Sequence, residues 1–294
     1  MENNFFCKLF LTDGSIIELE GNGELTREMT KSYKTMSTAI IGKLCTSIGN
    51  SAFYSFNSLI KVAISDTVSN IDNWAFANCQ NLKDILIPNS VTNIGEGAFL
   101  NCSSLANVVI PNSVASIGDE AFCNCVGLIS VKIGSGITNI GLSTFENCTS
   151  LIDVSIPNSV ESIGESAFIS CTSLKDVTIP DSVANIGMLA FTSCKSLSNL
   201  SIGNGVKKVG KFAFAGCASL TNVVFPNSIT SIGSMAFSNC KNLKTISIPS
   251  SVTDIGVEVF KYCFVLKDVI IIDASNLSPI VYEKLPIRIN TIHP

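Results

Sequence analysis

The sequence predicts a right-handed α/β solenoid, made mostly of short β-strands and turns, with about ten coils of 23 residues and a cap at each end. Nine cysteines recur every 23 residues, from Cys79 to Cys263. Phenylalanines keep the same interval from Phe53 to Phe260, and leucines keep it from Leu59 to Leu266. One such repeat is too small to bury its own apolar side chains. Stacking of the repeats is therefore expected, and it gives one continuous core.

Each repeat divides into two halves, as residues 104–125, SLANVVIPNSVASIGDEAFCNC, illustrate. Leu105, Val108 and Ile110 place apolar side chains on one side, which is typical of a short strand. Pro111 ends that strand, and Pro-Asn-Ser predicts a turn. In the second half Gly118 permits a tight bend, so the chain can return to the start of the next coil.

The pattern Leu-x-x-Val-x-Ile-Pro-x-Ser-Val-x-x-Ile-Gly-x-x-Ala-Phe-x-x-Cys resembles the leucine-rich repeat of the BspA type. The resemblance covers residues 36 to about 271 and departs from the pattern at Asp72, Phe56 and Phe225, which replace a glycine, a cysteine and an isoleucine. It implies a leucine-rich-repeat fold. It also implies a surface association, because proteins of this family in anaerobic bacteria and parasitic protists include adhesins for host matrix proteins.

The array needs caps, because an uncovered end coil exposes its core. Residues 1–35 are predicted to form an N-terminal capping segment, a hairpin around Asp13-Gly14 followed by a short helix; an independent binding module is the alternative. Residues 36–271 are predicted to form the array. Residues 272–294 are predicted to form a C-terminal capping tail over the apolar last coil. This tail is expected to cover Phe264 and Val265 through Ile280, Val281 and Leu285.

The cysteine column is predicted to be a row of reduced, buried thiols. Stacked side chains run parallel, whereas a disulfide needs them to converge, and zinc needs four ligands around one point. A catalytic cysteine needs a base, and the one histidine is His293. Cys45 is predicted to be buried, and Cys123 to be the exposed thiol. Twelve unpaired thiols fit a reducing compartment.

Composition and motifs exclude several classes of function. The net charge of −4 argues against nucleic-acid binding, and no apolar run is long enough for membrane insertion. GSGITNIG and GNGVKKVG carry Asn139 and Lys208 where a dinucleotide-binding loop needs its third glycine. The sequence thus predicts no catalytic residues, no cofactor and no metal.

The exposed strand positions are the candidate binding surface. The candidates for partner binding are Asp84, Leu86, Asn107, Val109, Lys132, Asp153, Asp176, Asn199, Asn222 and Asp268. Aspartate and asparagine are disfavoured in strands, so their abundance needs a reason. Either they form hydrogen-bond ladders between coils or they recognise a partner. Asp153 and Asp176 are predicted to lie about 5 Å apart and to repel each other, either as a solvated pair or as a site where a cation or a basic partner group relieves the repulsion.

The function predicted is a non-enzymatic protein–protein interaction scaffold that binds through its strands. The resemblance implies a surface adhesin for host or matrix proteins. The alternative is an intracellular scaffold or regulator of a kinase, phosphatase or cytoskeletal partner, and a homodimer stays open. The location is left open too. The start MENNFFCKLF shows no signal peptide and the thiols favour the cytoplasm, whereas the resemblance implies the cell surface.

Overall fold

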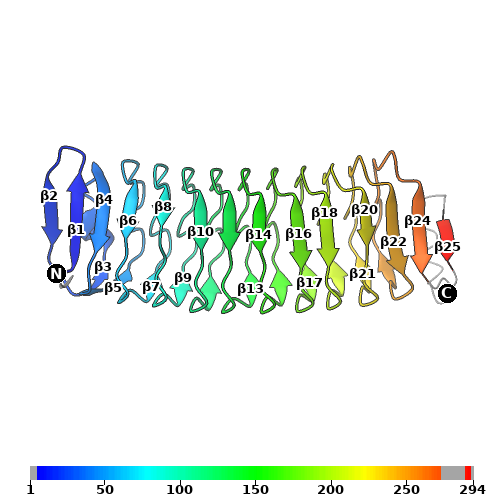
Figure 1. Ribbon diagram of the computed structural model, residues 1–294, viewed down its shortest axis with the longest axis horizontal. Coiled ribbons are helices and arrows are strands. Elements are labelled where there is room, and N and C mark those ends of the chain that lie inside the picture. The colour runs from blue at the N-terminus through cyan, green and yellow to red at the C-terminus, as the bar shows by residue number, and fades with distance from the viewer. Residues whose placement is uncertain (1–4, 273–288, 293–294) are drawn as a thin grey trace. The chain divides into compact units, whose positions relative to one another are not determined.

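The computed structural model describes residues 5–272 and 289–292, and it confirms a solenoid of short strands and turns (Figure 1). The chain divides into two compact units, Met1–Leu151 and Ile152–Pro294, and each is described by itself. The α/β class overstates the helix content, because the described residues contain only the one-turn helix α1 (Arg27–Thr30).

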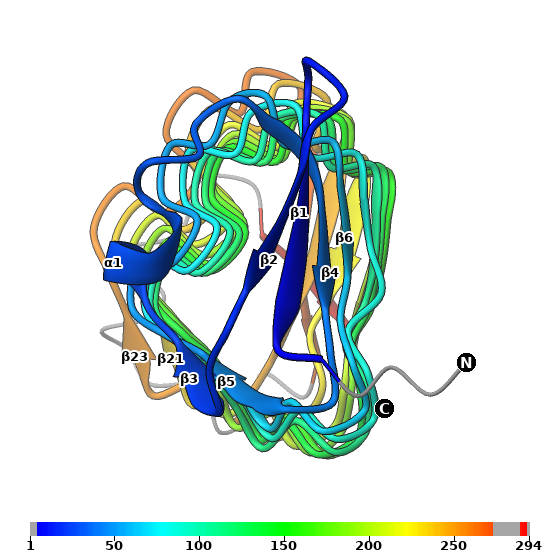
Figure 2. The same ribbon diagram turned by 90° about the vertical axis from the view of Figure 1, so that its left-hand side faces the viewer.

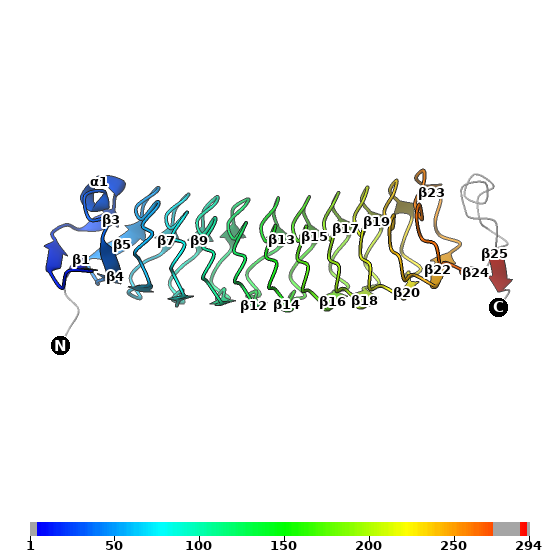
Figure 3. The same ribbon diagram turned by 90° about the horizontal axis from the view of Figure 1, so that it is seen from above.

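In the first unit each coil gives one strand to each of two sheets. The elements are β1 (Cys7–Leu11), β2 (Ile16–Leu19), β3 (Gly23–Leu25), β4 (Met36–Ile41), β5 (Cys45–Ile48), β6 (Lys61–Ala63), β7 (Asn70–Ile71), β8 (Asp84–Ile85), β9 (Asn93–Ile94), β10 (Asn107–Val109), β11 (Ser116–Ile117), β12 (Ser130–Lys132) and β13 (Asn139–Ile140). One sheet has the order β12-β10-β8-β6-β4-β1-β2, and the second has the order β11-β9-β7-β5-β3. Parallel partners lie 23 residues apart, as in Asn107 opposite Ser130. Figure 3 shows β7 and β9 on one side of the stack and β12 on the other.

The second unit repeats this arrangement, but its first sheet is interrupted. The elements are β14 (Asp153–Ser155), β15 (Ser162–Ile163), β16 (Asp176–Ile179), β17 (Asn185–Ile186), β18 (Asn199–Ile202), β19 (Lys208–Val209), β20 (Asn222–Val224), β21 (Ser231–Ile232), β22 (Thr245–Pro249), β23 (Asp254–Ile255), β24 (Asp268–Ile272) and β25 (Ile289–Ile292). β16 pairs with β18, and a separate sheet has the order β20-β22-β24-β25. The second sheet, β15-β17-β19-β21-β23, runs without this break.

The core of each unit is built from columns of like side chains. Phe53 and Phe76 stack with ring centroids 5.1 Å apart and ring planes 6° apart, and both rings are fully buried. Phe191 and Phe214 do the same in the second unit, at 5.3 Å. Offset-stacked aromatic pairs gain attraction beyond their buried area, so the column ties successive coils together.

The cysteine column is buried and unpaired, as predicted, except that Cys263 is half-buried. The structure adds a bond that the sequence did not suggest. Each of these thiols whose bond is described points at the carbonyl oxygen of the phenylalanine 26 residues earlier, as in Cys79 Sγ to Phe53 O at 3.0 Å and Cys194 Sγ to Phe168 O at 3.2 Å. A thiol is a weak donor, and here it adds a second bond to a buried carbonyl of the preceding coil that already accepts from a backbone N–H, as Phe168 O does from Cys171 N at 3.2 Å.

The prediction that Cys123 is exposed is wrong, because its side chain is only 7% exposed. Leu100 and Glu146 hold the same place in the neighbouring coils of this unit and are both longer, so the small thiol lies between them. Burial, together with the smaller effect of the nearby Glu146 carboxylate, raises the pKa of Cys123 to about 12. Cys45 is buried as predicted.

The N-terminal segment takes the place of a coil below the first repeat. β1 pairs antiparallel with both β2 and β4, whereas β3 pairs in parallel with β5, which sets Leu25 opposite Ile48, 23 residues later. The Thr30 hydroxyl at the end of α1 donates to the carbonyl of Ala52. In Figure 2, α1 lies away from β4 and β6 and beside the turns.

Phe56 stands in the first coil where later coils have cysteine, and its surroundings explain the change. The residue 26 positions earlier is Thr30, whose hydroxyl already serves the buried carbonyl of Ala52. Two cations of the N-terminal segment lie over the Phe56 ring, with Lys34 Nζ 4.3 Å and Arg27 Cζ 5.3 Å from its centroid. Cation–π contacts of this kind attach the N-terminal segment to the first coil.

At the other end, β25 continues the first sheet by pairing in parallel with β24. The predicted contacts of Ile280, Val281 and Leu285 lie outside the described residues. Phe264, which the sequence predicts to be covered, is 77% exposed, and Val265 is 38% exposed. The role of residues 272–294 as a cap stays a prediction.

Candidate functional site

The candidate surface is the outer side of the first sheet in each unit, here called the strand face. Along each strand the side chains alternate, because successive residues of a strand point to opposite sides. Val108 is 2% exposed, whereas Val109 beside it is 54% exposed. The predicted site residues Asp84, Leu86, Asn107, Val109 and Lys132 are exposed on the first unit, and Asp153, Asp176, Asn199 and Asn222 are exposed on the second. Asp268 is half-buried.

Polar side chains on the strand face form hydrogen-bond ladders between coils. Ser130 Oγ donates to Asn107 Oδ1 at 2.8 Å, and Thr245 Oγ1 donates to Asn222 Oδ1 at 2.7 Å. The Asn199 side-chain amide donates to Asp176 Oδ1. Hydrogen-bond ladders between coils, one of the two explanations for the abundant asparagine and aspartate, are therefore present. Recognition of a partner by these residues stays a prediction.

Leu86 and Val109 form an apolar pair on the strand face of the first unit. They follow Asp84 and Asn107, which lie opposite each other on β8 and β10. Leu86 is 77% exposed and Val109 is 54% exposed. Lys132, on the next strand, lies opposite Val109, so a cation borders the pair. The pair is a plausible contact for an apolar side chain, although it is small.

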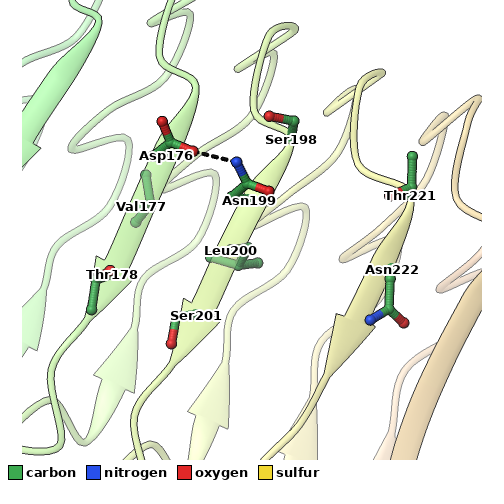
Figure 4. Close-up of a pocket in the computed structure, with 9 residues that line it drawn as sticks. All are labelled: Asp176, Val177, Thr178, Ser198, Asn199, Leu200, Ser201, Thr221 and Asn222. Atoms are coloured by element: carbon green, nitrogen blue, oxygen red, sulfur yellow. Dashed lines mark hydrogen bonds between the residues drawn. The ribbon is translucent and has the colours of Figure 1, made fainter.

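A groove opens on the strand face of the second unit, between β18 and β20. A shallow pocket of about 430 Å³ is lined by Asp176, Val177, Thr178, Ser198, Asn199, Leu200, Ser201, Thr221 and Asn222 (Figure 4). A second pocket shares Leu200 and Ser201 with it and continues to Asn204 and Pro226. Leu200 and Ile202 are half-buried, whereas Val177 and Ile179 on β16 are 2% and 1% exposed. The groove thus exposes part of the core.

Two departures from the repeat pattern lie beside the groove. In the turn 203–205, glycines replace proline and serine, and a Cβ on Gly203 would lie 2.5 Å from the Pro180 carbonyl carbon. Asn204 N also donates to Asp181 Oδ1 at 2.6 Å, so this coil is held against the coil before it. Phe225, in place of an isoleucine, is buried edge-on against Phe237 of the same coil, at 5.7 Å.

The sequence analysis missed this groove. Its signals are the glycine turn and Phe225, two departures from the repeat that fall in consecutive coils.

The strand face offers hydrogen bonds, charge and small apolar contacts. Within residues 5–272 and 289–292, no group of three or more histidine, cysteine, aspartate or glutamate side chains could hold a metal ion. In the same ranges no helix is long and apolar enough to cross a membrane.

This fold and surface define the chain as a leucine-rich-repeat solenoid. The family model of the BspA type leucine rich repeat region matches residues 29–152 and 140–267, with six copies. The chain belongs to this family, as the repeat pattern predicts. Families of stacked repeats present extended binding surfaces.

Solved structures share the fold. A leucine-rich repeat protein from Eubacterium ventriosum is 23% identical, with 88% of this chain and 87% of that chain covered and a TM-score of 0.50. The pneumococcal vaccine antigen PcpA is 17% identical, with 90% and 76% covered and a TM-score of 0.52. A leucine rich cell surface protein from Faecalibacterium prausnitzii is 28% identical, with 93% and 87% covered and a TM-score of 0.47. A search of curated proteins finds no match.

Proposed function

We propose that this protein is a non-enzymatic protein–protein interaction scaffold that binds its partner through the strand face. The observation that carries the proposal is the outward row of exposed side chains on strands that parallel ladders hold at a fixed spacing. Lys61, Asp84 and Asn107 are successive members of that row. A preorganised surface loses little conformational entropy on binding, which favours recognition of a protein over a broad area.

The ladder and recognition roles of the polar residues are compatible. Asn107 uses its Oδ1 to accept from Ser130, and the residue is exposed. A partner can therefore bond the same side chain without breaking the ladder. The apolar pair Leu86 and Val109 supplies buried area once a partner covers it.

Two uses of such a scaffold follow from the sequence analysis. The family resemblance supports a surface adhesin for host or matrix proteins, and the many unpaired thiols support an intracellular scaffold of a signalling or cytoskeletal protein. Labelling of intact source cells with a membrane-impermeant biotin reagent separates them, with a cytosolic protein as leakage control. Recovery of the chain supports the adhesin, and its absence from the labelled fraction supports the intracellular scaffold.

Paired surface variants test the proposal. In one variant, Leu86→Arg and Val109→Arg add charge and bulk to the strand face. In the matched control, Thr92→Arg and Ala115→Arg do the same at exposed positions beside β9 and β11 of the second sheet. The three proteins are compared in quantitative pull-downs from source-cell protein and on purified matrix proteins.

Partners are defined as proteins that the wild-type protein enriches at least fivefold. We expect the strand-face variant to lose these partners and the control to retain them. All four positions are exposed, so both variants should fold. Equal loss in the two variants, or loss in the control alone, contradicts the proposal.

A further inference from the structure

We propose that the groove between β18 and β20 binds an extended polypeptide segment of the partner, with apolar side chains on Leu200 and Ile202 and a basic side chain at Asp176. This inference rests on the proposed function and names the class of partner that one part of the strand face recognises. The first sheet of this unit is also unpaired between β14 and β16, but there Lys175 N still donates to Ile152 O at 3.4 Å, a bond with no counterpart across the groove within the described residues.

The groove has open backbone edges. Elsewhere in this unit the residue before a strand donates to the residue before the preceding strand, as in Ser198 N to Lys175 O and Lys244 N to Thr221 O, both at 2.9 Å. Within the described residues, no such bond joins Thr221 N to Ser198 O. No ladder of paired residues joins β18 to β20 either. A polypeptide backbone supplies alternating donors and acceptors, the groups that such edges can bond.

The floor of the groove is apolar. Leu200 and Ile202 are the inward residues of β18, and both are half-buried where their equivalents on β16 are buried. Val224, which also lines the groove, is 56% exposed. An extended segment whose alternate residues are aliphatic would place those side chains on this floor, because strand side chains alternate between two sides.

The rim is acidic. Asp176 is exposed and lies beside Asn199, whose amide occupies its Oδ1 (Figure 4). Asp153 and Asp176 together line a further pocket, between β14 and β16. Neither carboxylate makes an ion pair with any described residue. A lysine or arginine of the partner is the complementary group for these exposed carboxylates.

A saccharide is the competing class of ligand, since hydroxyl and amide side chains also suit sugars. A sugar ring commonly rests its C–H face on an exposed aromatic ring. The aromatic residue of this groove is Phe225, which is 2% exposed and so offers no ring face. The apolar floor is aliphatic and the backbone edges are open, so the observations favour a polypeptide.

The test uses a defined probe, the fluorescein-labelled peptide Ser-Lys-Thr-Val-Thr-Val-Thr-Lys-Ser, whose alternate residues place two valines and two lysines on one side. Its matched controls carry glutamate in place of lysine, or N-methyl groups on the valine amides. Maltoheptaose is the saccharide probe. Binding of each to the full chain is measured by fluorescence anisotropy, or by calorimetry for the saccharide.

Two variants localise the binding. Ser201→Trp fills the groove from an exposed position that lines both pockets. Ala63→Trp adds the same ring at the equivalent exposed position of β6, which is paired on both sides. Asp176→Asn removes the charge on the rim. Urea unfolding of each variant confirms that it folds.

We expect wild type and Ala63→Trp to bind the lysine peptide with Kd values within twofold of each other. Ser201→Trp should bind at least tenfold more weakly, as should the glutamate and N-methylated peptides with wild type. Asp176→Asn should weaken binding about threefold and reduce its salt dependence.

Three results overturn the proposal: no binding of the lysine peptide to wild type at 1 mM, equal binding by Ser201→Trp, or a saccharide that binds in a Ser201-dependent way. The failure of this proposal is distinguishable from failure of the proposed function. If the peptide does not bind but the strand-face variants lose partners, only the groove assignment falls. If the peptide binds in the groove but those variants keep every partner, the contact at Leu86 and Val109 falls and the groove assignment stands.

Discussion

At the residue scale, cysteine serves this fold as a small buried hydrogen-bond donor between coils. Serine would fit the same volume, but moving its hydroxyl out of water costs more free energy than moving a thiol. The thiols of the column fill core space and add a second hydrogen bond to a carbonyl, as Cys217 Sγ does to Phe191 O at 3.2 Å. The column therefore needs no oxidation or metal to contribute to stability.

Thiol labelling checks this role. With a fast thiol reagent and the native protein, we expect one reactive thiol, Cys263, because it is the half-buried member of the twelve. After denaturation all twelve should react. Intact mass before and after labelling gives the counts, and a Cys263→Ser variant should remove the native reaction. Rapid native reaction of Cys123 or of most of the column would contradict the burial described here.

A second residue-scale feature is the left-handed backbone that recurs in every coil. One such position is occupied by asparagine in several coils, including Asn78 at φ 61° and Asn101 at φ 59°, and asparagine adopts this region more readily than most residues. Their side chains also bond each other at 2.7 Å. Tyr262 occupies the same position in the last coil, at φ 63°, and is 55% exposed.

The change Tyr262→Asn should raise the free energy of unfolding by about 1 kcal/mol, since it relieves part of the cost of a left-handed non-glycine residue. Little packing is lost, because the ring is mostly exposed. Urea denaturation measures the change, and Tyr262→Phe is the control that leaves the backbone cost in place. Destabilisation by Tyr262→Asn would show that the tyrosine ring makes a contact that outweighs the strain.

At the element scale, the repeat pattern predicts the strands and turns because every slot is set by stacking. A valine or isoleucine before Pro-Asn-Ser is confined to the core column, because equivalent residues of the coils on both sides lie there. The pattern gives no such constraint where the repeat stops. The parallel pairing of β3 with β5 was not predicted, because Leu25 and Thr30 alone carry the 23-residue spacing there. The groove was missed because the departures beside it, the glycine turn 203–205 and Phe225, leave the repeat pattern in register.

The attachment of the N-terminal segment depends on Thr30, which is fully buried. Thr30→Val keeps the shape but leaves the Ala52 carbonyl without the hydroxyl that it accepts from, so we expect a loss of about 1–3 kcal/mol in unfolding free energy. Thr46→Val, at an exposed position, is the control and should change it by less than 0.5 kcal/mol. Urea denaturation followed by circular dichroism provides the values. No effect of Thr30→Val would mean that this segment does not cover the first coil.

At the scale of the whole molecule, the buried thiols make stability depend on alkaline pH. Burial raises the pKa of Cys79 and of Cys194 from 9.0 to about 12. In the unfolded chain these thiols ionise near pH 9, whereas in the folded protein they stay protonated up to about pH 12. Their contribution is therefore fully present below pH 9 and is lost as the pH rises from 9 towards 12.

Unfolding free energies measured between pH 7 and 11 should be flat below about pH 8 and fall above pH 9. Each buried thiol adds up to about 1.4 kcal/mol per pH unit to the slope. Lysine and tyrosine also titrate in this range, so wild type is compared with Cys194→Ala. The unfolding free energy of this variant should fall less steeply with pH, by the contribution of one thiol. Identical slopes for wild type and Cys194→Ala would contradict a raised pKa for Cys194.

The central claim is that this repeat protein recognises another protein with its strand face, and the most direct measurement is site-specific photo-cross-linking. Benzoylphenylalanine is placed at Leu86, which is 77% exposed on the strand face, or at Thr92, which is exposed beside the second sheet. Each variant is irradiated in source-cell protein, and the adducts are resolved by mass. The account predicts discrete adducts from position 86 and none from position 92. Adducts from position 92 alone, or the same adducts from both positions, would contradict it.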